Sequence, residues 1–70
     1  MEQLKKQFGK RVQTLRLKRK MTQEDLANAV GVTVESISNI ERGVYGASFD
    51  TLEKLAAAFG QDVKHLFIFD

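Results

Sequence analysis

Glu35, Asn39 and Arg42 are spaced so that a helix would carry all three on one outward face. If Ile37 points inward and each residue turns the helix by about 100°, the three lie within about 40° of the opposite side. Val34 lies about 60° from Ile37 and can project at the start of the helix. Asn can pair with adenine, Glu can accept from cytosine, Val can pack on a thymine methyl, and Arg can bind guanine or phosphate. Nucleic acid is therefore a candidate partner of this face.

The charges of the chain are divided unevenly along the sequence. The net charge at pH 7 is +2, from 11 basic and 9 acidic side chains. Residues 1–20 hold eight basic side chains and one acidic one, whereas residues 21–70 hold three basic and eight acidic ones. This division favours contact with nucleic acid or an anionic membrane, although a solvated helix face would also explain it.

Length and composition argue against an enzyme, a metalloprotein and a secreted protein. Seventy residues allow one domain, 1–70, with little room for a deep substrate cavity. There is no Cys, and the single His65 has no second His beside it, so we expect no metal, no cofactor and no catalytic residue. Residues 1–8 lack the apolar core of a signal peptide, and no stretch is apolar enough for a membrane span. We therefore expect a cytoplasmic protein without a small-molecule ligand.

Apolar residues recur at helical spacing, and the chain contains no proline. A first helix is predicted to run to about Lys20, with Gly9 weakening it slightly. Its inward stripe consists of Leu4, Phe8, Val12 and Leu15. A single helix is therefore predicted to span the basic segment, residues 1–20.

Two short helices are predicted after the basic segment. Thr22 can cap the first of them, with Asp25 in a capping-box position, and Gly31 ends it. Thr33 can cap the second, which ends near Arg42 and Gly43. The helix capped by Thr33 has Ile37 and Ile40 as its inward residues. The helix capped by Thr22 has Leu26, Ala27 and Val30 as its inward residues. Because only a tight turn separates the two, residues 22–43 are predicted to form a helix-turn-helix.

A fourth and a short fifth helix are predicted to complete an all-α fold. Ser48 can cap the fourth, which Gly60 ends, and Asp62 can cap the fifth over residues 63–67. The inward residues of the fourth helix are Leu52, Leu55, Ala56 and Phe59. The expected architecture is a bundle of five helices.

The stretch TQEDLANAVGVTVESISNIERG over residues 22–43 resembles the helix-turn-helix of the Xre family, the lambda-repressor-like and Cro-like DNA-binding domains. The residues that carry the resemblance are Gln23, Ala27, Gly31, Ile37 and Ile40. The LRLKRKMTQ stretch before the motif and SFDTLEKLAAAFG after it are also similar to the family. The resemblance implies a five-helix, lambda-repressor-like DNA-binding domain over nearly the whole chain.

The resemblance also implies roles for individual residues. The second helix of the motif would enter the major groove, with Val34, Glu35 and Asn39 at the positions that usually read bases. Arg42 stays open between guanine and phosphate, and Glu35 could instead serve only the positive end of the helix dipole. The expected phosphate contacts are Gln23, Thr33, Ser38, Tyr45, Lys10, Arg11, Lys18, Arg19 and Lys20. Arg16 and Glu41 match a structural ion pair of the family.

The apolar end of the chain, Leu66, Phe67, Ile68 and Phe69, has two interpretations. Exposed apolar residues usually mark an interface, so these four can form the contact of a homodimer. A two-fold dimer would place its recognition helices about 34 Å apart and favour an inverted-repeat operator. Alternatively, the same residues close the core of the single chain.

The predicted function is that of a sequence-specific DNA-binding transcriptional regulator, of the controller or phage type. Its expected partners are double-stranded DNA and a second copy of the chain. RNA polymerase is a further expectation, through an acidic surface of Glu24, Asp25 and Glu53. The alternative is a protein-interaction module, such as a small antitoxin that docks a partner through its acidic surface.

Overall fold

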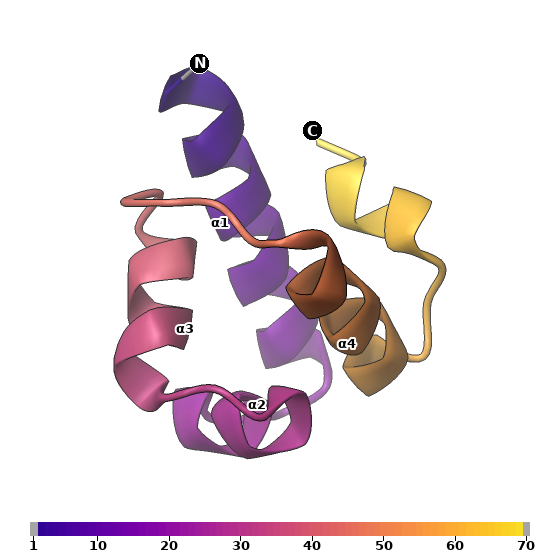
Figure 1. Ribbon diagram of the computed structural model, residues 1–70. Helices are drawn as coiled ribbons and strands as arrows, with labels where there is room; N and C mark the ends of the chain where they lie inside the picture. The colour runs from indigo at the N-terminus through magenta and orange to yellow at the C-terminus, as the bar shows by residue number, and fades with distance from the viewer. Residues whose placement is uncertain (1, 70) are drawn as a thin grey trace.

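The computed structural model describes residues 2–69, with side chains described from residue 3 onward. These residues form α1 (Glu2–Lys18), α2 (Gln23–Val30), α3 (Val34–Glu41), α4 (Phe49–Phe59) and the short 3-10 helix η1 (Val63–Phe67). No strand occurs between residues 2 and 69. Helix α3 lies on one side of α1, whereas α4 and η1 lie on the other (Figure 1). None of the described helices is long and apolar enough to cross a membrane.

The predicted caps of α2 and α3 are present, and they fix the turn between the two helices. Thr22 Oγ1 accepts from the Asp25 amide at 3.0 Å, and Asp25 Oδ2 accepts from the Thr22 amide at 3.0 Å. Gly31 ends α2 with a φ of 82°, a left-handed conformation that glycine adopts without strain. Thr33 Oγ1 accepts from the Ser36 amide at 3.0 Å. The predicted helix-turn-helix is therefore confirmed.

The fifth helical element differs from the α-helix that the sequence predicts. Ser48 caps α4 as expected, with Oγ accepting from the Thr51 amide at 3.2 Å. The next segment, η1, is a 3-10 helix of five residues, and its N-cap residue Asp62 makes no side-chain capping bond. So short a segment gains few α-helical hydrogen bonds for the residues it orders, and a tighter turn takes its place. The fold is thus four α-helices and a 3-10 helix.

The two ends of α1 also depart from expectation. The helix ends at Lys18 rather than Lys20, because Lys20 has a φ of 56° and the Met21 amide donates to the Arg16 carbonyl at 3.1 Å. Leu4 was predicted to point inward, yet 51% of it is exposed. The first turn of α1 projects beyond the neighbouring helices (Figure 1). Leu4 lies in this turn and lines an open hollow with Phe8 and Phe67, so it is only partly covered.

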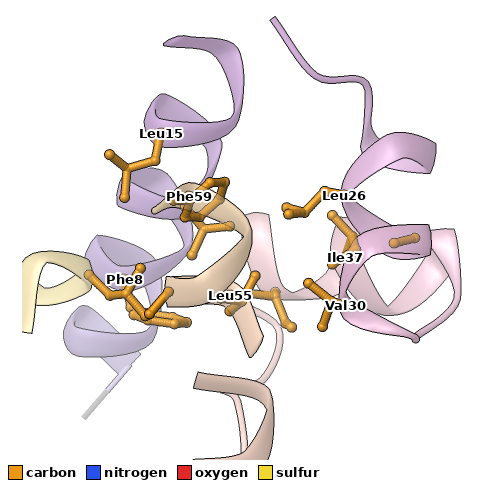
Figure 2. Close-up of a cluster of buried hydrophobic side chains, with 12 residues drawn as sticks. Phe8, Leu15, Leu26, Val30, Ile37, Leu55 and Phe59 are labelled. Carbon is orange, nitrogen blue, oxygen red and sulfur yellow. The ribbon is translucent and has the colours of Figure 1, made fainter. Parts of the chain in front are cut away.

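One apolar core joins all five elements. Figure 2 shows Phe8 and Leu15 of α1, Leu26 and Val30 of α2, Ile37 of α3, and Leu55 and Phe59 of α4 converging on it. Leu66 of η1 is also fully buried, whereas Leu52, predicted to be an inward residue of α4, is only partly buried at its edge. The core therefore holds α3 rigidly against the rest of the domain.

Gly9 marks the closest approach of α1 and α3. A Cβ at this position would lie 2.7 Å from the Glu41 carbonyl oxygen and nearer still to that of Ile40. From the sequence alone, Gly9 is expected only to weaken its helix. The structure shows that its missing side chain lets the two backbones touch.

Candidate nucleic-acid interface

Helix α3 presents a solvent-facing side that is fixed from behind by the core. Ile37 and Ile40 are 0% and 3% exposed. On the other side, Val34, Glu35 and Arg42 are exposed, and Asn39 is half-buried. The outward face expected from helical geometry is therefore the face that is exposed to solvent. Asn39 is the least exposed of the four residues expected to read bases.

A polar network covers this side of α3 and consists of Thr33, Ser36, Asn39, Arg42 and Tyr45; we call it the α3 network. Asn39 Nδ2 donates to the Tyr45 hydroxyl at 3.4 Å, and an Arg42 Nη donates to Asn39 Oδ1. Thr33 Oγ1 donates to Ser36 Oγ at 3.1 Å. Hydrogen bonds from the side chains of Ser36 and then Asn39 hold the pKa of Tyr45 below its ordinary value. Tyr45, from the loop after α3, therefore lies against the helix face.

A nearly buried ion pair ties α1 to the end of α3. Arg16 Nε and Nη2 donate to the two carboxylate oxygens of Glu41 at 2.7 and 3.1 Å. Arg16 Nη1 also donates to the Met21 carbonyl at 2.8 Å, and Gln23 Nε2 donates to Glu41 Oε1 at 3.0 Å. The amide expected to clamp a phosphate is thus held by Glu41 in the free protein. This cluster fixes the start of α2 relative to the end of α3.

The five basic residues expected to contact phosphates fall into two groups rather than forming one face beside α3. Lys10 and Arg11 lie about 100° and 200° around the helix from Gly9, which faces α3. They line a hollow with Ile68 and Phe69, and Arg11 Nε donates to the His65 carbonyl at 2.9 Å. The second group, Lys18, Arg19 and Lys20, stands exposed at the end of α1. Within it, Arg19 donates to the Phe59 carbonyl.

Comparison with known proteins identifies the family of this domain. A helix-turn-helix family model matches residues 12–66. The chain belongs to the Xre and Cro/C1 type of helix-turn-helix protein. This is a family of DNA-binding transcriptional regulators, and the resemblance seen in the sequence is confirmed.

Individual relatives match this helix-turn-helix protein over most of their length. An uncharacterized helix-turn-helix transcriptional regulator of Archaeoglobus fulgidus is 42% identical over 60 residues, covering 86% of this chain and 84% of its own. Control protein C.BamHI of Bacillus amyloliquefaciens is 41% identical over 63 residues, and the match covers 89% of this chain and 78% of C.BamHI. The restriction-modification controller protein C.AhdI of Aeromonas hydrophila has a similar structure, with a TM-score of 0.87 and 32% sequence identity. The match covers 90% of this chain and 96% of C.AhdI.

The C-terminal residues of the helix-turn-helix protein divide between core and surface. Leu66 is fully buried and Phe69 is half-buried, so these two close the core of the single chain. Phe67 and Ile68 remain 41% and 48% exposed, although Phe67 stacks on Phe8 with ring centroids 5.2 Å apart. Of the four residues expected at a dimer contact, Leu66 is therefore excluded by burial.

Two features of the surface escaped sequence reasoning. Ser36 joins the α3 network through Thr33 and Tyr45, and it is absent from the residues expected to face DNA. Phe49 is 86% exposed at the first turn of α4, and nothing in the apolar pattern distinguished it from a core residue.

His65 has a buried Nδ1 without a hydrogen-bond partner. Within the described residues, no three His, Cys, Asp or Glu side chains gather as metal ligands.

Proposed function

We propose that this protein regulates transcription by binding specific DNA sequences with α3 in the major groove. The observation that carries the proposal is the solvent-facing side of α3, where Val34, Glu35 and Arg42 are exposed. The opposite side is anchored by Ile37 and Ile40 in the core. A helix held rigidly with hydrogen-bonding side chains toward solvent meets the requirements for reading base edges.

The residues divide into base readers and phosphate contacts. Val34, Glu35, Asn39 and Arg42 face the groove in this proposal, with Arg42 able to bind guanine or a phosphate. The residues that contact phosphates are Lys18, Lys20, Gln23, Thr33, Ser38 and Tyr45. Arg19 also contacts a phosphate, through the guanidinium N–H groups that are not bonded to the Phe59 carbonyl. Lys10 and Arg11 are left out because they lie beside the C-terminal residues.

We also propose that two copies pair on an inverted-repeat operator. The support is apolar surface: Leu4 and Phe67 line one hollow, and Ile68 is exposed next to Phe67. A two-fold dimer places two recognition helices about 34 Å apart, one turn of DNA. The similarity to C.BamHI and C.AhdI, which are both controller proteins, favours a controller-type regulator.

The salt dependence of DNA binding tests the proposal. The protein is titrated into random-sequence duplexes at several salt concentrations, and log K is expected to fall linearly with log salt. Lys18→Ala is expected to reduce the slope by about 0.9, the value for one lost phosphate contact. Lys54→Ala, which removes an exposed charge from α4, is the matched control and is expected to leave the slope unchanged.

Two results would contradict the proposal. The first is binding that is undetectable at low salt, which would favour the protein-interaction module. The second is an equal change of slope for Lys18→Ala and Lys54→Ala, because net charge rather than a DNA-binding face would then govern affinity.

A further inference from the structure

Several polar side chains on the solvent-facing side of α3 are already hydrogen-bonded to one another in the free protein. The Asn39 amide bonds to Tyr45 through Nδ2 and to Arg42 through Oδ1. Tyr45 reaches it from the loop that follows α3, six residues further along the chain. Of the residues expected to read bases, Asn39 is therefore the one whose side chain is oriented from both ends.

This engagement leaves the Asn39 amide able to read a base. An amide NH₂ has two donors and an amide oxygen has two lone pairs, so Tyr45 and Arg42 each use half of what is available. One N–H and one lone pair remain, and these are the two groups that adenine N7 and N6 require in the major groove. The network also decides which side of the amide carries the donor.

Resting on the function proposed above, we propose that Tyr45 determines base specificity by fixing the orientation of the Asn39 amide, so that Asn39 reads adenine. Tyr45 is thus a positioning residue on the base side of the interface rather than only a phosphate contact. Asn39 then loses little side-chain conformational entropy when DNA binds, because its side chain is already held in the free protein.

The titration of Tyr45 offers a test of the same contacts that requires no DNA. Donation by Ser36 and Asn39 stabilises the phenolate and lowers the pKa of Tyr45, against the opposing effects of desolvation and of the Glu35 charge. Since Tyr45 is the sole tyrosine and there is no tryptophan, ultraviolet absorbance follows this one group. Asn39→Ala is expected to raise the midpoint of the titration. Asn28→Ala, at an exposed amide of α2, is the matched control and is expected to leave it unchanged.

The decisive experiment is the base preference of Tyr45→Phe, which removes only the hydroxyl. Wild-type protein and variant are each used to select binding sites from random duplexes, and affinities are then measured for the site and its single-base changes. Tyr45→Phe is expected to lose at least about five-fold of the discrimination for adenine at one position of each half-site. Asn39→Ala is expected to act at the same position, and the double variant is expected to lose no more there than Asn39→Ala alone.

The outcomes separate this inference from the function on which it rests. If wild-type protein selects no motif, the proposed function fails and the inference falls with it. If wild-type protein selects a motif that Tyr45→Phe reproduces unchanged, or if the variant weakens all duplexes equally, only the inference is overturned. An unaltered Tyr45 titration in Asn39→Ala would likewise overturn it, because the two side chains would then not be in contact.

Discussion

Arg16 carries its charge where little water reaches it, and its partner Glu41 is more deeply buried still. Their side chains are 9% and 2% exposed, and the pair makes two hydrogen bonds. A buried ion pair adds little stability by itself, but removal of one partner leaves a buried charge without compensation. The pair therefore matters chiefly because it fixes the ends of three helices relative to one another.

Glu41→Ala tests this role at the scale of the single residue. We expect it to lower the free energy of unfolding by about 3–5 kcal/mol, because Arg16 loses its counter-ion and Gln23 loses its acceptor. Urea denaturation followed by circular dichroism measures the change. The exposed Glu53→Ala on α4 is the control, with an expected change within about 0.5 kcal/mol. Equal effects of the two variants would refute the account.

At the scale of the element, the sequence predicted what depends on local chemistry. Thr22, Thr33 and Ser48 cap their helices as expected, and Gly31 adopts the left-handed turn, because capping involves residues only a few positions apart. The exposed side of α3 followed equally from helical periodicity. Such features could be predicted because each depends on the spacing of neighbouring residues.

What could not be predicted depends on distant contacts. The exposure of Leu4 and the division of the α1 bases reflect where α4 and η1 come to lie. The contact of Tyr45 with Asn39 depends on the path of a loop that has no periodicity. For the same reason, sequence reasoning read Gly9 as a local weakness and missed its part in the contact between α1 and α3.

Gly9→Ala tests the contact between α1 and α3. Alanine favours a helix, but its Cβ would meet backbone oxygens of Ile40 and Glu41 that cannot move independently of α3. We expect a net destabilisation of about 1–3 kcal/mol by urea denaturation, the typical cost of overpacking. Gly46→Ala is the matched control, since a Cβ there meets nothing within 4 Å. A Gly9→Ala protein as stable as the wild type would show that the helices are not in such close contact.

At the scale of the whole molecule, the proposed dimer assigns a role to apolar residues that the core leaves exposed. Phe67→Asp places a charge beside Leu4 in the shared hollow, and we expect it to yield a monomer by light scattering. Because Phe67 also stacks on Phe8, denaturation must show that the variant remains folded. Leu17→Asp, at an apolar side chain that is 57% exposed on α1, is the control and is expected to remain dimeric.

Either of two results would refute this interface. A folded Phe67→Asp protein that is still dimeric would place the contact elsewhere. A wild-type protein that is monomeric at all concentrations tested would remove the need for an interface.

Site selection by the wild-type protein from random duplexes shows whether α3 reads DNA sequence. We expect an enriched inverted repeat whose half-sites have centres about one helical turn, 10 to 10.5 base pairs, apart. Asn39→Ala is expected to relax the preference at one position of each half-site, while Lys18→Ala is expected to weaken binding to all sequences alike. Enrichment of no motif, or a motif unchanged by Asn39→Ala, would contradict this role of α3.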